Sequence, residues 1–226
     1  MKSALAFATV LTGLALAATA APAHAAEPEA ATVENAASTD SISQIVTAVE
    51  SRYAKVQTIQ AKFTQVKKDA FGTVSQDGDV VVARPTKMRW RFLTGDEQIF
   101  ATDGETLTIY AKADNYYQQM PDSTSGSDSV QGFLTSLDRL DEIFEVSLVD
   151  GGLTADAGPT LHLVPRKPGA VASIRLDLDK ALIVEQVVMT DSYGNVTDLT
   201  FSEVVYDKPI DDAIFKFAQP DAATDR

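Results

Sequence analysis

Residues 87–92 read Lys-Met-Arg-Trp-Arg-Phe, a strict alternation of basic and apolar side chains. A period of two predicts a β-strand with one apolar face and one solvated face. The apolar face consists of Met88, Trp90 and Phe92, and the basic face consists of Lys87, Arg89 and Arg91. The apolar side chains have two interpretations, ordinary core or the lining of a ligand cavity, and the sequence is compatible with both.

Runs of the same kind lie on both sides of this segment. They alternate or carry β-branched residues, and they span residues 63–68, 79–83, 98–102, 105–110, 116–120, 144–149, 160–164, 173–178, 183–190 and 196–203. Asp103-Gly104 separates two of them, and Asp-Gly between alternating runs is the strongest short-range signal of a hairpin. We therefore expect about ten strands at short spacing.

Two segments have helical spacing instead. The first begins at Ser41, where Ser41 and Gln44 resemble a capping box, and its pattern stops at Thr58. Its apolar face consists of Ile42, Ile45, Val46, Val49, Tyr53 and Val56. The second spans residues 130–140, with Phe133 and Leu137 on its apolar face. The fold class expected is mainly β with helices (α+β), an antiparallel barrel or strongly curved sheet with helices on one side.

The N-terminus has the features of a processing signal. Lys2 precedes an apolar stretch over residues 4–20, and Ala23-His24-Ala25 fits the small-x-small cleavage rule. Residues 1–25 are therefore expected to be a signal peptide, and the mature chain to start near Ala26. Because the sequence contains no Cys, we expect no lipid-anchored N-terminus. We expect a disordered tether over 26–40, one domain over 41–220 and a flexible C-terminus over 221–226.

Charge and composition exclude several classes of function. The formal net charge of -13 argues against binding of nucleic acid and against electrostatic docking on anionic lipid. After cleavage, His162 is the sole histidine, and a lone strand histidine does not indicate a catalytic triad. No metal, nucleotide or dinucleotide motif is present, so we expect no cofactor. A secreted binder of apolar ligands or a structural domain remains, and an enzyme that uses paired carboxylates is a weaker alternative.

Several short motifs, in order and spacing, resemble the LolA family of periplasmic carriers of outer-membrane lipoproteins. The resemblance covers about Ser41 to Pro220. The motifs are Ala61-x-Phe63-x-Gln65, Gly78, Arg84-Pro85, Trp90, Asp103-Gly104, Tyr110, Leu163-x-Pro165, Asp191-x-x-Gly194-Asn195-x-Thr197, Phe201 and Phe215-x-Phe217-x-x-Pro220. A lipid- or lipoprotein-sensing regulatory domain of similar fold is the alternative.

The resemblance implies an incomplete β-barrel with a helical lid that encloses an apolar cavity for acyl chains. It implies that Arg84 hydrogen-bonds the lid and gates the cavity. The candidate cavity-lining residues are Met88, Trp90, Phe92, Phe63, Phe133 and Leu137. The family often has an aromatic residue at the position of Met88, so the details of ligand contact differ here.

The resemblance also implies partners and a location. The cargo would be acylated lipoprotein in the periplasm, received from an inner-membrane lipoprotein-releasing ABC transporter. Delivery would be to an outer-membrane lipoprotein acceptor or to the membrane itself, and the carrier would be a monomer that is not an enzyme. The basic row of Lys87, Arg89 and Arg91 is a candidate docking surface for an acidic partner, with an ordinary solvated face as the alternative.

Overall fold

The computed structural model describes residues 29–95, 97–122, 130–149 and 158–217. The expected signal peptide, the start of the mature chain, most of the loop 122–129, the turn at 150–152 and the C-terminus 221–226 lie outside these ranges. Within the described part of the chain, no helix combines the length and the apolar character needed to cross a membrane.

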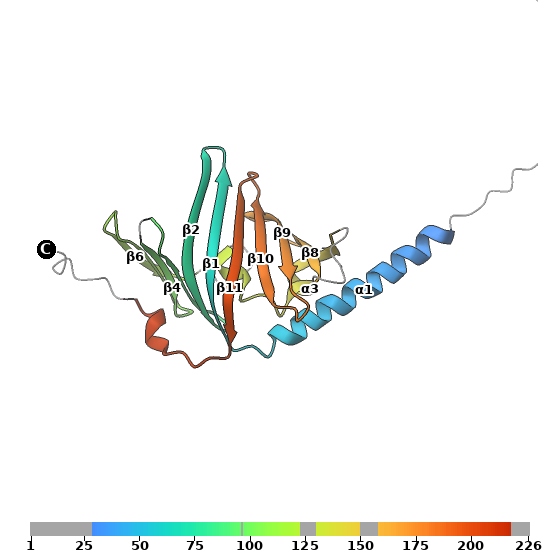
Figure 1. The fold of residues 1–226 in the computed structure, drawn as a ribbon, viewed down its shortest axis with the longest axis horizontal. Coiled ribbons are helices and arrows are strands. Elements are labelled where there is room, and N and C mark those ends of the chain that lie inside the picture. The colour runs from blue at the N-terminus through green and yellow to red at the C-terminus, as the bar shows by residue number, and fades with distance from the viewer. Residues whose placement is uncertain (1–28, 96, 123–129, 150–157, 218–226) are drawn as a thin grey trace, which may run out of the picture.

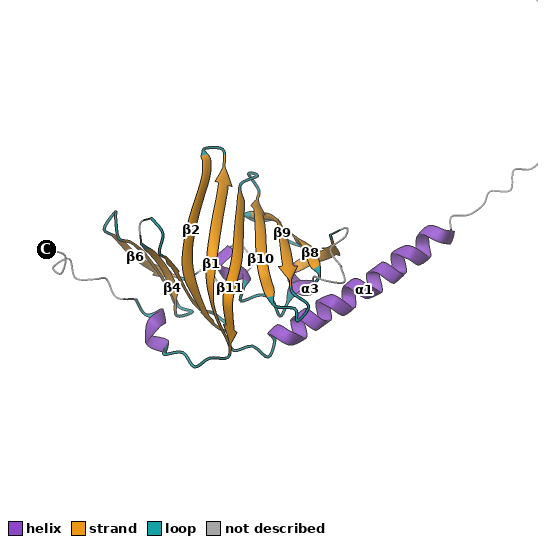
Figure 2. Cartoon of the chain, in the orientation of Figure 1, coloured by secondary structure: helices purple, strands orange, loops and turns teal. Residues whose placement is uncertain are grey.

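The described strands form one antiparallel sheet of eleven strands (Figures 1 and 2). They are β1 (Thr58–Asp69), β2 (Gly72–Ala83), β3 (Lys87–Phe92), β4 (Gln98–Thr102), β5 (Thr106–Ala111), β6 (Tyr116–Pro121), β7 (Phe144–Leu148), β8 (Thr160–Pro165), β9 (Val171–Leu178), β10 (Val184–Asp191) and β11 (Val196–Tyr206). The order is β6-β5-β4-β3-β2-β1-β11-β10-β9-β8-β7. The first and last strands of the described sheet thus join at its centre, and β6 and β7 are its two edges. The expected mainly β, incompletely closed architecture is confirmed.

The helices differ in detail from the expectation. α1 spans Glu29–Tyr53, so it begins well before Ser41 and ends before Thr58. Residues 29–40, expected to be a disordered tether, are helical. This segment lacks the apolar periodicity that the prediction required, but it is rich in Ala and Glu, which have high intrinsic helix propensity.

The second expected helix is interrupted. Two short helices, α2 (Val130–Phe133) and α3 (Leu140–Ile143), replace the single helix expected over 130–140. Between them the amide of Ser136 donates to the carbonyl of Phe133, and the hydroxyl of Thr135 donates to the carbonyl of Gly132 at 2.7 Å. Ser and Thr hydroxyls offer the backbone such alternatives to a continuous helix. Both short helices lie in the connection between the edge strands β6 and β7.

The interior lies between the sheet and these helices. Met88, Trp90 and Phe92 are buried, which confirms the alternation of residues 87–92. They belong to one apolar cluster with Val49 of α1 and with Phe133 and Leu137 of the β6–β7 connection. Because residues from all three segments share this cluster, the helices cover one face of the sheet.

A smaller apolar cluster lies on the opposite face of β4 and β5. It consists of Ile99, Ala101 and Tyr110, with Tyr117 and Phe217 packed against it. The short 3-10 helix η1 (Asp212–Phe215) precedes Phe217, whose carbonyl accepts a hydrogen bond from the Tyr117 hydroxyl at 3.1 Å. The C-terminal segment therefore covers the outer face of this half of the sheet.

Candidate functional site

Aromatic side chains dominate the interior. The Phe63 ring lies 4.9 Å from the Trp90 ring and 5.1 Å from the Phe92 ring, both edge-on, and the Trp90 ring lies 6.3 Å from that of Phe201. Phe133, from α2, packs edge-on against Phe144 of β7. All six expected lining residues are thus buried in the interior, Phe133 and Leu137 on its helical side and the other four on the sheet. Met88, Trp90 and Phe92 were expected on one face of a strand, and Phe133 and Leu137 on one face of a helix. The structure brings these two faces together with Phe63.

The interior is closed, however. A pocket beneath the end of α1 is lined by Tyr53, Leu134 and Leu137 on the helical side and by Ile59, Val184 and Phe201 on the sheet side, among others. Its volume is about 10 Å³, about what one water molecule requires. Of the six expected residues, Leu137 alone is among those that line it. A pocket of this size has no room for an acyl chain, so a chain could enter it only if the helices moved.

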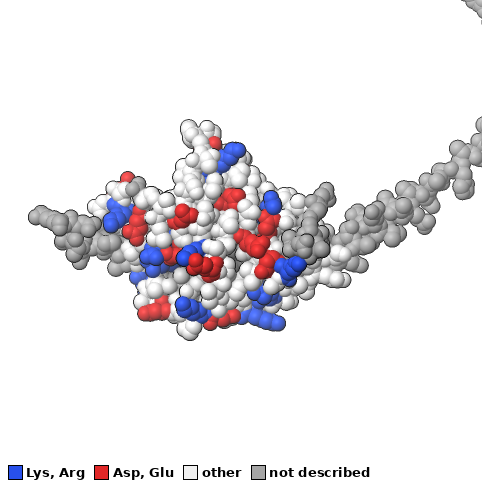
Figure 3. All heavy atoms as spheres, viewed as in Figure 1, with Lys and Arg blue, Asp and Glu red and all other residues white. Residues whose placement is uncertain are grey.

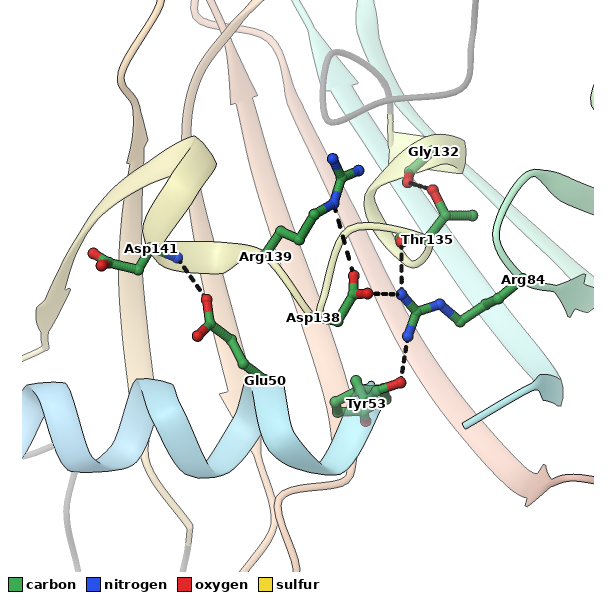
Figure 4. Close-up of polar contacts among 8 residues, drawn as sticks. All are labelled: Glu50, Tyr53, Arg84, Gly132, Thr135, Asp138, Arg139 and Asp141. Atoms are coloured by element: carbon green, nitrogen blue, oxygen red, sulfur yellow. Dashed lines mark hydrogen bonds and ion pairs between the residues drawn. The ribbon is translucent and has the colours of Figure 1, made fainter. Parts of the chain in front are cut away.

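Arg84 joins the sheet to both parts of the helical cover (Figure 4). Its guanidinium donates to the backbone carbonyl of Tyr53, the last residue of α1, and to the carbonyl of Thr135 at 3.4 Å. It also forms an ion pair with Asp138, in the turn between α2 and α3. The Arg84 side chain is 9% exposed and that of Asp138 is 24% exposed. We call these four residues the Arg84 cluster.

Both the backbone carbonyl and the side-chain hydroxyl of Tyr53 form hydrogen bonds. Its carbonyl accepts from Arg84, while its hydroxyl accepts from the amide of Val184 at 3.1 Å and lies 3.0 Å from the hydroxyl of Tyr206. Burial, with Tyr206 beside it, raises the pKa of the Tyr53 hydroxyl well above its usual value. The C-terminus of α1 is therefore fixed to β10, to β11 and to Arg84.

A further contact joins the helices to each other. The amide of Asp141, in α3, donates to a carboxylate oxygen of Glu50 in α1 at 2.8 Å. Acceptance of a first-turn amide by a carboxylate is favourable at a helix N-terminus. Motion of α1 away from the interior would break this bond as well as those of the Arg84 cluster, so the two helical segments are mechanically coupled (Figure 4).

The partners of Arg84 were not predicted from the sequence. Asp138 and Thr135 lie in a segment expected to be helix, and nothing in their spacing points to residue 84. The carbonyl of Tyr53 carries no sequence signal either, because any residue supplies a carbonyl. The family resemblance implied that Arg84 hydrogen-bonds the helical cover, but only the fold gives its partners.

The basic row lies on the outer face of β3, and two of its members are paired within the chain. Lys87 forms an ion pair with Asp212 of η1 at 2.6 Å, and Arg91 forms one with Asp79 of β2 at 2.6 Å. Arg89 is half-buried, and its Nε has no hydrogen-bond partner among the described residues. A docking role for the row stays a prediction, and most of its positive charge is already balanced locally.

The described residues offer little reaction chemistry. None of them gather into a group of three or more His, Cys, Asp or Glu side chains that could hold a metal ion. His162 lies on β8, where it pairs with Arg175 of β9 and Ser147 of β7, and it is half-buried. The arrangement is suited to enclosing an apolar ligand, because its conspicuous features are a closed apolar interior and a polar latch on the cover.

Comparisons with known proteins agree with this arrangement. The model of the family described as "Outer membrane lipoprotein carrier protein LolA" matches residues 54–218. An outer-membrane lipoprotein carrier protein of Cupriavidus taiwanensis is 32% identical over 191 residues, which cover 84% of this chain and 87% of the relative. One from Pseudomonas entomophila is 28% identical over 181 residues, 75% of this chain and 81% of the relative. The solved structure of an uncharacterized conserved protein from Thermus thermophilus has the same fold, with a TM-score of 0.51, 18% identity and coverage of 80% and 96%.

Proposed function

Because the chain belongs to the LolA family of outer membrane lipoprotein carrier proteins, we propose that it carries lipoproteins through the periplasm with their acyl chains held in the apolar interior. The observation that carries this proposal is the Arg84 cluster. One guanidinium fastens both helical segments directly over a closed apolar interior, so the cover can be released without unfolding the sheet.

The energetics of the cargo require such an interior. Burial of one methylene is worth about 0.8 kcal/mol, so exposure of an acyl chain of about 15 methylenes to water costs on the order of 12 kcal/mol. A carrier must offset most of that cost during transit. It must also release the cargo, so its affinity must stay below that of the acceptor.

A closed, latched interior meets both requirements. Entry of acyl chains would displace α1 and the α2–α3 turn and break hydrogen bonds of the Arg84 cluster. The lost bonds lower the affinity for cargo, and their reformation favours release. The interior also contains a donor without a partner among the described residues, Nε1 of Trp90. Buried polar groups are usually paired, so an interior that rearranges around a ligand would account for it.

The partners follow from the same proposal. Cargo would be received from an inner-membrane lipoprotein-releasing ABC transporter and passed to an outer-membrane acceptor or to the membrane itself, by a monomeric carrier without catalytic activity. The expected signal peptide over 1–25 would deliver the chain to the periplasm. Because the sequence contains no nucleotide-binding motif, the energy for loading would come from the donor.

Mass spectrometry of the protein purified from periplasm tests the proposal, with acylated lipoprotein expected to co-purify. A second readout uses Trp90, which is the single tryptophan of the chain and lies in the interior. Titration with a triacylated lipopeptide should change its fluorescence emission, whereas the deacylated peptide should not. Absence of lipoprotein from the purified protein together with an unchanged emission would contradict the carrier proposal.

A further inference from the structure

Two neighbouring hairpins have the same sequence pattern at their turns, Asp-x-aromatic-Gly. The β1–β2 hairpin turns at Asp69-Ala70-Phe71-Gly72, and the β10–β11 hairpin turns at Asp191-Ser192-Tyr193-Gly194. β1 pairs with β11, with Lys68 opposite Val196, so both turns lie at the same end of the sheet. Figure 1 shows the two hairpin ends side by side at the top of the view, with the β1–β2 hairpin projecting farther.

Both turns are built to present an aromatic side chain outward. Phe71 is 99% exposed and Tyr193 is 92% exposed. In each turn an aspartate carboxylate accepts the amide of the aromatic residue, at 2.7 Å for Phe71 and 2.8 Å for Tyr193. These bonds preorganise the turns, so the aromatic rings are displayed on a formed backbone. Two large aromatic side chains, almost fully exposed at the same end of the sheet, indicate a binding surface.

The β1–β2 hairpin carries its aromatic residue away from the body of the protein. The last buried residue of β1 is Gln65 and the first of β2 is Gly78, and no residue from 66 to 77 is buried. At about 3.4 Å per residue the hairpin extends on the order of 15–20 Å beyond the core. The screening length at physiological salt is about 8 Å. The tip of the β1–β2 hairpin is therefore screened from much of the acidic charge that gives the chain its formal net charge of -13.

The basic and acidic groups at the tip also differ in their interactions. Lys67 and Lys68 are exposed, and neither forms an ion pair with any residue that the structure describes. The carboxylates of Asp69 and Asp191 instead point into their turns, where they accept backbone amides, and Asp191 also accepts from the side chain of Asn195 at 2.7 Å. In Figure 3 the projecting tip at the top of the view is mostly uncharged, with a basic area just below it.

From these observations we propose that Phe71 and Tyr193 insert into the interfacial region of a phospholipid bilayer, with Lys67 and Lys68 against lipid phosphates. Aromatic rings with adjacent lysines are the side chains that partition to this region. The overall charge argued against electrostatic docking on anionic lipid, and this contact differs in that the rings supply most of the binding. Two rings give weak, reversible attachment, which suits a protein that visits a membrane and leaves it.

Partition of the full mature chain onto vesicles tests the proposal. Wild type should bind vesicles of phosphatidylethanolamine and phosphatidylglycerol, and Phe71→Ala with Tyr193→Ala should weaken binding at least tenfold. Lys67→Gln and Lys68→Gln should each weaken it up to about fivefold, from about 1 kcal/mol per basic residue at an anionic surface, with a smaller effect on phosphatidylcholine. Matched controls are Tyr116→Ala, an aromatic residue 44% exposed on the edge strand β6, and Lys180→Gln in the β9–β10 turn.

A depth measurement separates membrane insertion from a structural effect. In Phe71→Trp, brominated phospholipid should quench the new tryptophan, whereas wild type, whose single Trp90 is buried, should stay unquenched. No partition at millimolar lipid, or equal partition of the double variant and Tyr116→Ala, would overturn the proposal and leave a protein partner as the ligand of the tip. The experiment uses no cargo, so its failure would not affect the carrier proposal.

Discussion

The guanidinium of Arg84, directly after β2, forms an ion pair with the carboxylate of Asp138 in the turn between α2 and α3. The same guanidinium holds the last carbonyl of α1. A single side chain at the rim of the sheet therefore ties down both helical segments that close the interior, and removal of either charge should change the balance between closed and open states.

Replacement of Arg84 by Leu should leave folding and loading intact but slow unloading. Hydrogen bonds from a charged donor are worth about 1.5–3 kcal/mol, enough to bias a lid by roughly ten- to a hundredfold. Without them the open, loaded state no longer competes with a well-bonded closed state. Arg84→Lys should be intermediate, because Lys lacks the planar fork. A two-step assay that scores loading from donor membranes and unloading to acceptor membranes separately checks this, and equal unloading by Arg84→Leu and wild type would refute it.

Asp138→Asn should also slow unloading, but less than Arg84→Leu does. The carbonyls of Tyr53 and Thr135 still accept hydrogen bonds from Arg84 in this variant. The double variant with Arg84→Leu should lose little more than Arg84→Leu alone, since residues in one ion pair are not additive. Unloading to acceptor membranes, scored in the same two-step assay, is the measurement. Asp141→Asn is the control, because its amide, and not its carboxylate, contacts Glu50. Full additivity would show that the pair does not act as a unit.

Gly78→Ala should destabilise the protein by about 1–3 kcal/mol, the usual cost of overpacking. Gly78 lies opposite Phe63 in the β1–β2 pair, and an added Cβ would lie 2.5 Å from Cζ of Phe63 and would also meet the backbone oxygen of Arg91. Urea denaturation measures the free energy of unfolding. Ser75→Ala, exposed on the same strand, should change it by less than about 0.5 kcal/mol, and a similarly small change in Gly78→Ala would contradict the expectation.

Tyr53→Phe should alter stability in a pH-dependent way. Burial raises the pKa of Tyr53 in the folded state, whereas an unfolded tyrosine ionises near pH 10. Above about pH 10 the unfolded state loses the Tyr53 proton while the folded state retains it. The contribution of Tyr53 to the free energy of unfolding is therefore complete below about pH 10 and is lost as the pH rises further. Tyr53→Phe should remove this alkaline loss and cost about 1–3 kcal/mol at neutral pH, because the amide of Val184 loses its acceptor.

Urea denaturation at pH 8 and pH 10.5 gives the measurement for that variant. Tyr116→Phe, on an exposed residue, should leave the alkaline dependence of wild type unchanged. If Tyr53→Phe kept the full alkaline dependence, another group would be responsible for it.

The sheet and the composition of its inner face were predictable from the sequence. Side chains alternate along a strand, so the pattern of residues 87–92 already assigns Met88, Trp90 and Phe92 to one face, and the turn residues mark where strands end. The early start of α1 was not predictable from apolar periodicity, because residues 29–40 form a helix without an apolar stripe. The break between α2 and α3 was missed because apolar spacing continues through it.

The closure of the interior and the partners of its charged residues were decided by the tertiary structure alone. Arg84 meets Asp138 because the β6–β7 connection crosses the face of the sheet, and Lys87 meets Asp212 because the C-terminal segment returns to β3. The two aromatic turns become one surface only because β1 pairs with β11. Local periodicity reports which way a side chain points relative to its own element, whereas contacts between distant segments depend on how the elements pack, and that packing is set by the chain as a whole.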